Sequence, residues 1–290
     1  MVDTLLAFDS AANAGKPNML NSSNPTMKAF DRPIEAPRWE DLAASASGQA
    51  SAAQGAVMTV RGTAIKTGFL LAIVVVSAAM SWMKFEPLVQ AKQAGAIMPW
   101  FLGSMLGGLV LSLIVSFKPT TAPYLAPIYA AVQGVFLSAL SLFISLQFLK
   151  GVEGALIFQA MTLTFGIAGA TFIAYASGLV RIGGMVAKIM TVAMLGLVLY
   201  SVALLLCNGL LNMNVPNLWS STTPMGIAFS GFVVLLASFS LVQDYQVIEE
   251  SAAAGAPKHM EWYGAFALTV TLVWLYIEVL RLLAKLRGRE

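Results

Sequence analysis

The chain has 290 residues, of which 58% are hydrophobic and 11% are charged, and its formal net charge is +3. A soluble domain carries about 25% charged residues, so this chain has too few charges to cover a globule of its size in water. The apolar surplus indicates a lipid environment. The basic residues are too scattered to form a run that binds nucleic acid.

Residues 1–60 differ from the rest of the chain. They are rich in Ala, Ser, Asn, Pro and Gly, and they hold charged pairs such as Asp31-Arg32 and Glu40-Asp41. Such a segment buries too little apolar area to offset the entropy of ordering its backbone. The composition predicts a soluble, mostly disordered tail over 1–60 and a transmembrane domain over 61–290.

Seven apolar runs follow the tail, and a helix that crosses a bilayer core needs about 20 residues. Helices are expected because lipid cannot satisfy free backbone groups, and because the runs lack the alternation of a transmembrane barrel. The sequence therefore predicts an all-α membrane bundle of about seven transmembrane helices. The expected spans are 64–84, 97–117, 124–148, 153–179, 186–211, 225–248 and 262–285.

Basic residues divide evenly between the two sides of this arrangement, so the positive-inside rule gives no orientation. A re-entrant last segment would place both termini on one side, and it stays open as an alternative to a seventh full span.

Small residues recur every four positions in the fourth span, at Gly166, Ala170, Ala174 and Gly178. Residues four apart share one face of a helix, and a face of small residues lets a neighbouring helix approach closely. The spacing predicts that this face packs against another helix.

Two acids lie in the last two spans, Asp244 in the sixth and Glu278 in the seventh. An ionised side chain at the centre of a membrane helix costs about 3 kcal/mol on insertion scales, so each acid calls for a reason. The two helices are consecutive and are expected to be antiparallel neighbours. Two close carboxylates would share one proton, or bind Ca²⁺ transiently when both are ionised.

Structural interpretations compete with this pairing. Arg281 follows Glu278 at a spacing that suits a local salt bridge on one helix face. Asp244 lies near the charged end of its span at Glu249-Glu250, and it is alternatively an interfacial acid.

Several enzyme classes lack their residues here. His259 is the only histidine, and it falls in a loop, so neither a paired-histidine metalloprotease nor a serine–histidine dyad within the membrane fits. A retinal protein needs a lysine deep in the last helix, whereas Lys285 stands at its very end. We expect no enzymatic activity and no cofactor.

The stretches Leu241 to Gln246 and Leu275 to Leu283 resemble the two terminal helices of the Bax inhibitor-1 family, and the soluble tail resembles that of its bacterial Bax inhibitor-1-like branch. Asp244-Tyr245-Gln246 is similar to an Asp-Thr-Gln-like triplet in the penultimate helix of that family. Leu275-Tyr276-Ile277-Glu278 is similar to a Leu-Tyr-Leu-Asp-like run in the last helix, with glutamate in place of aspartate. The resemblance covers roughly residues 56–290.

The resemblance implies a bundle with the last helix at its centre. It also implies a pH-sensitive calcium leak in which Asp244 and Glu278 form the proton sensor. The second span contains no Lys or Arg to serve as the basic latch of this family, and Arg281 is the candidate substitute.

We therefore expect a multi-pass protein of the bacterial inner membrane that passes calcium ions under the control of protons. Two alternatives stay open, a proton-coupled transporter that uses the same acids and a non-conducting scaffold that regulates a partner such as a membrane protease. The protein partners themselves are not predicted.

Overall fold

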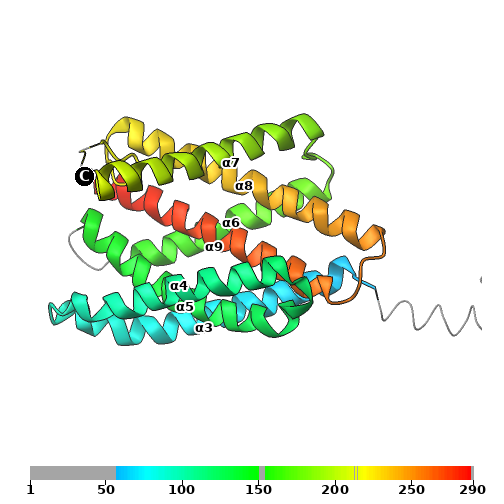
Figure 1. Cartoon of the computed structure of the whole chain (residues 1–290), viewed down its shortest axis with the longest axis horizontal. Helices are drawn as coiled ribbons and strands as arrows, with labels where there is room; N and C mark the ends of the chain where they lie inside the picture. The colour runs from blue at the N-terminus through cyan, green and yellow to red at the C-terminus, as the bar shows by residue number, and fades with distance from the viewer. Residues whose placement is uncertain (1–56, 150–153, 212, 214, 289–290) are drawn as a thin grey trace, which may run out of the picture. The chain divides into compact units, whose positions relative to one another are not determined.

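The computed structural model describes residues 57–149, 154–211, 213 and 215–288. This part of the chain forms seven long helices, each long and apolar enough to cross a membrane, and the predicted all-α bundle is confirmed (Figure 1). The helices are α3 (Val60–Gln90), α4 (Met98–Phe117), α5 (Ala122–Leu149), α6 (Gly154–Ala176), α7 (Gly184–Leu204), α8 (Pro224–Ala253) and α9 (Met260–Arg287). A π-helical turn, Leu205–Leu210, extends α7.

The predicted tail over 1–60 lies almost entirely outside the described residues and stays a prediction. Where the described chain begins, the backbone N–H of Met58 donates to the carbonyl of Ala256 at 2.7 Å. The hydroxyl of Thr59 then accepts from the N–H of Gly62 at 3.0 Å, which is the usual cap of a helix N-terminus. The first span therefore starts at Val60, close to the change in composition.

The last helix is the core of the bundle. It packs against α3, α5, α6 and α8, and half of its most apolar stretch is buried, compared with 11% for α7. Helix α9 is unbroken over 28 residues, which at about 1.5 Å per residue exceeds the thickness of a bilayer core. The start of α3 and the end of α9 lie at opposite ends of the bundle (Figure 1). This favours a seventh full span over the re-entrant alternative.

The small-residue face of α6 does not pack against another helix, so that prediction was wrong. Gly166 and Ala170 are exposed, and a Cβ built on Gly166 would meet no described atom within 4 Å beyond its own turn of α6. The close helix approach instead occurs at Gly134 on α5, where a Cβ would lie 1.7 Å from the hydroxyl of Ser77 and 2.4 Å from the carbonyl oxygen of Val74 on α3. The α3–α5 crossing is therefore a place where close packing of two helices requires glycine.

Candidate functional site

The triplet Asp244-Tyr245-Gln246 joins α8 to three other parts of the bundle. The Asp244 carboxylate accepts a hydrogen bond from the hydroxyl of Thr271 on α9 at 2.6 Å. The Tyr245 ring packs edge-on against an aromatic ring of α6. The Gln246 amide accepts from the N–H of Ile182 at 2.9 Å and donates to the carbonyl of the same residue at 3.2 Å. These contacts fix α8 against α9, α6 and the connection from α6 to α7.

The second motif faces the interior of the bundle from α9. Leu275 is fully buried, and the Tyr276 hydroxyl shares a 2.9 Å hydrogen bond with Ser141 on α5. Glu278 is only 3% exposed. One Nη of Arg281 donates to both Glu278 oxygens, at 2.7 and 2.8 Å, so the local salt bridge that the sequence offered as an alternative is present.

Glu278 begins a row of three charged residues on one face of α9. Arg281 and Lys285 follow it at spacings of three and four, which place all three on the same side of a helix. The Arg281 guanidinium lies 4.7 Å from the centre of the Trp219 ring, in the α7–α8 connection. Lys285 has no exposed surface. Its ammonium donates three hydrogen bonds, to the carbonyls of Leu218 and Gly226 at 2.8 and 3.0 Å and to the hydroxyl of Ser230 at 2.7 Å.

The two acids lie on the facing sides of α8 and α9, which are packed neighbours as predicted. Asp244 meets α9 at Thr271, two turns before Glu278. At about 1.5 Å per residue, this separates the two levels by about 10 Å along the helix axis. In this conformation each carboxylate has its own partner, Thr271 for one and Arg281 for the other.

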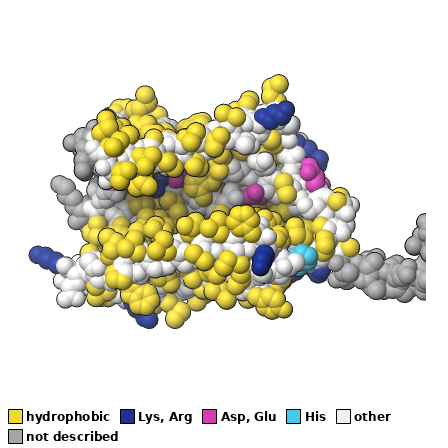
Figure 2. All heavy atoms as spheres, in the orientation of Figure 1, with side chains coloured by type: hydrophobic (Ala, Val, Ile, Leu, Met, Phe, Trp, Pro, Cys, Tyr) yellow, Lys and Arg dark blue, Asp and Glu magenta, His cyan; other side chains and the backbone are white. Residues whose placement is uncertain are grey.

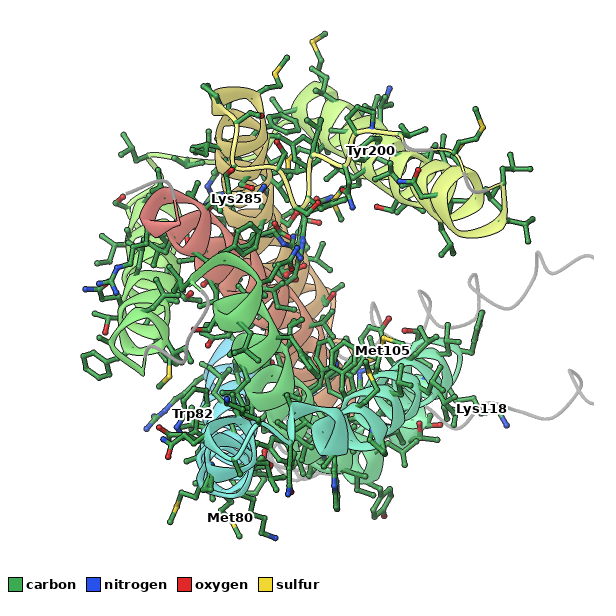
Figure 3. The ribbon with its side chains drawn as sticks, turned by 90° about the vertical axis from the view of Figure 1, so that its left-hand side faces the viewer. Met80, Trp82, Met105, Lys118, Tyr200 and Lys285 are labelled. Carbon is green, nitrogen blue, oxygen red and sulfur yellow. The ribbon has the colours of Figure 1, made fainter. Side chains whose placement is uncertain are left out.

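A furrow runs along the bundle between α4 and α7. Figure 2 shows acidic side chains on its floor, one of them next to a basic side chain. Viewed along the bundle, Tyr200 on α7 and Met105 on α4 mark its two walls (Figure 3). The α7 wall is formed by the least buried of the described spans. The hydroxyl of Tyr200 accepts from the N–H of Leu218 at 3.0 Å near the C-terminal end of α7, and Gln246 bonds to Ile182 just before its N-terminal end.

Two buried charges were missed from the sequence. In the sequence, Lys285 resembles an ordinary charged residue at the end of a helix. Its spacing from Glu278 and Arg281 is the signal that it shares one helix face with them. Glu261, 1% exposed, lies at the other end of α9. It binds the ammonium groups of Lys66 and Lys258 and accepts from the backbone and the hydroxyl of Thr59. Nothing in the sequence indicates that Glu261 is buried, because two of its partners, Lys66 and Thr59, lie about 200 residues away.

The chain matches a known protein family over most of its length. The family described as Bax inhibitor 1 like matches residues 20–288, which includes all seven helices and both motifs. The chain belongs to the Bax inhibitor 1 like family. With seven apolar helices, this Bax inhibitor 1 like protein is an integral, multi-pass membrane protein. Neither a curated protein nor a solved structure matches the chain.

Proposed function

We propose that this Bax inhibitor 1 like protein is a passive cation leak, with calcium as the permeant ion and with Asp244 and Glu278 as the proton-binding control. The bacterial inner membrane is the proposed location. The observation that carries the proposal is the placement of two carboxylates on the facing sides of the neighbouring membrane helices α8 and α9. Asp244 on α8 meets α9 at Thr271, two turns before Glu278 on the same face of α9. Membrane proteins keep ionisable groups at such depth mainly where ions or protons pass.

Carboxylates give the path an affinity for a hard cation. Calcium takes six to eight oxygen ligands, among which carboxylates and water predominate. The two acids and the hydroxyl of Thr271 supply oxygens at two levels, and water would complete the shell. Within the described residues no group of three or more His, Cys, Asp and Glu side chains gathers as a metal site.

Protons would act on the same oxygens. A protonated carboxyl has no net charge for a cation, and Glu278 also loses its ion pair with Arg281 when it is protonated. The Trp219 ring already lies beside the Arg281 guanidinium, and an aromatic face holds a cation in the absence of an acid. Arg281 is thus the proposed latch, in place of a basic residue on an early helix.

Calcium flux into vesicles that contain the purified protein, measured over a pH series around neutrality, tests the proposal. Asp244→Asn and Glu278→Gln should each flatten the dependence of flux on pH. Because the two acids act as one control, the double variant should behave much like the single variants. The matched control is Glu250→Gln, which changes an exposed acid of α8 and should keep the wild-type profile.

Two results would count against the mechanism. If Asp244→Asn keeps the wild-type pH response, the acids do not act together. If Glu278→Gln only reproduces the effect of Arg281→Ala and leaves the pH profile unchanged, the pair is a structural salt bridge. A flux that requires an opposing proton gradient would indicate the coupled transporter, and no flux under any condition would indicate the scaffold.

A further inference from the structure

A cavity of about 400 Å³ lies between α3 and α6, away from the furrow. Helices α5 and α9 form its floor. Its walls are mainly aliphatic and aromatic, with Trp82 on α3 and Phe165 on α6 as large contributors. Figure 3 shows Trp82 on the side of α3 that faces α6, whereas Met80 points away from the bundle. The volume is within the range of about 300–1,000 Å³ that small-molecule sites occupy.

Apart from the Trp82 indole N–H, which donates to Glu86 at 2.8 Å, the polar side chains that line this cavity are hydroxyls, and one of these hydroxyls has no partner among the described residues. Tyr276 and Ser141 bond to each other at 2.9 Å, and Thr164 donates to the carbonyl of Ala160 at 2.7 Å. Ser138 is only 4% exposed, and its buried hydroxyl has no hydrogen-bond partner among the described residues. Buried hydroxyls are nearly always satisfied, so this one calls for a partner that the protein does not supply.

The cavity opens towards the lipid. Met83 and Phe158 line it and are 75% and 71% exposed, so they form a rim between α3 and α6 on the surface that faces the bilayer. A molecule that enters here comes from the membrane rather than from water. No charged side chain is among the described residues that line the cavity, and burial of an ion without a partner is costly.

We propose that this cavity binds a neutral, single-chain lipid with one hydroxyl or carbonyl group, of the class of the fatty alcohols. Its oxygen would bond to Ser138, and its chain would lie between Trp82 and Phe165. Tyr276 forms part of the wall and precedes Glu278 by two positions on α9. The occupant would therefore contact the helix that carries the acid. Binding is independent of whether the protein conducts ions.

Photolabelling of the purified full-length protein with a diazirine-bearing octanol tests the proposal. Mass spectrometry should place the label on the parts of α3 and α6 that line the cavity, and an excess of plain octanol should displace it. Ala79→Phe narrows the cavity and should abolish this labelling. Ala72→Phe is the matched control, because Ala72 is exposed on the same helix but does not line the cavity.

Ser138→Ala tests the hydrogen bond separately. One hydrogen bond changes affinity by about fivefold, so displacement should require about five times more octanol in this variant, while displacement by octane should not change. The substitution removes an unsatisfied hydroxyl, so it keeps the fold and gives a result even if Ala79→Phe does not fold. Label that persists in a folded Ala79→Phe variant, or octanol displacement that is unchanged in Ser138→Ala, would overturn the proposal.

Discussion

A lysine ammonium has three donors, and Lys285 uses all three inside the bundle. Two of its acceptors are backbone carbonyls, one in the α7–α8 connection and one in the first turn of α8. Arg281 and Glu278 are its neighbours along the helix. Lys285 therefore bonds the end of α9 to the α7–α8 connection and to the start of α8. It lies in the same row of charged residues as Glu278, one of the two proposed proton-binding acids.

Lys285→Met should destabilise the protein. The substitution removes the three hydrogen bonds from the ammonium to two carbonyls and a buried hydroxyl, and hydrogen bonds to a charged group contribute about 1.5–3 kcal/mol each in favourable cases. We expect a loss of about 3 kcal/mol, seen as a lower melting temperature in detergent. Lys188→Met, at an exposed position of α7, is the control and should melt like the wild type. Equal melting temperatures for both variants would show that the Lys285 hydrogen bonds contribute little.

Candidate site residues could be predicted from the sequence where a charged side chain lies within an apolar membrane span. Asp244 and Glu278 stand out because a charge inside an apolar run is costly, and Arg281 because its partner is one turn away. Lys285 and Glu261 could not be found in this way. The partners of Lys285 lie at residues 218–230, and those of Glu261, apart from the nearby Lys258, lie at residues 59–66; only the folded chain brings these segments to α9.

Helices were predictable from the sequence, but their contacts were not. The expected span 97–117 differs by one residue from α4, Met98–Phe117, because bilayer thickness and helix-breaking residues set both ends. The packing of α6 was mispredicted because its lipid-facing and helix-facing sides are equally apolar. On an apolar helix, small residues do not indicate which side packs against a neighbouring helix. In a soluble protein, the polar side of the helix would identify the side that faces water, and the opposite side would be the packed one.

The α3–α5 crossing gives the corresponding test at the level of helices. Gly134→Ala places a methyl group against the backbone of α3 at 2.4 Å, which the helices can relieve only by separating. Overpacking of this kind costs about 1–3 kcal/mol or more, so the melting temperature should fall. Gly166→Ala on α6 meets open space in the described structure, and by helix propensity it should be neutral or stabilising by up to about 1 kcal/mol. The reverse order of the two variants would contradict this assignment of contacts.

At the scale of the molecule, the bundle has a tight part and a loose part. Helices α3, α5 and α9 pack closely on one another, whereas α7 contacts the other long helices mainly through α8. The two walls of the furrow thus differ in how firmly they are held. If the acids on its floor control conduction, α7 is the wall that can move against α4.

Spin labels test this movement. Cys207 is the only cysteine of the chain and lies in the extension of α7, and Ser112→Cys adds a second site on α4. The distance between the two labels, measured by pulsed electron paramagnetic resonance, should shift over the pH range in which flux changes. Asp244→Asn should remove the shift. A control pair on α3 and α5, Met80→Cys with Tyr124→Cys in a Cys207→Ser background, should report one distance throughout. A constant Cys207–Ser112 distance across that range would exclude α7 as the moving wall.

The central place of α9 has a consequence for how the protein is made. Chains are synthesised from the N-terminus at about 5–20 residues per second, so α9 leaves the ribosome after α3, α5, α6 and α8, the helices that pack on it. Until then Lys66 lacks Glu261, and Ser230 lacks the ammonium of Lys285. A nascent chain that stops before residue 260 keeps the direct α3–α5 and α4–α5 contacts, but it lacks the central helix on which α3, α5, α6 and α8 pack and the partners of these polar groups.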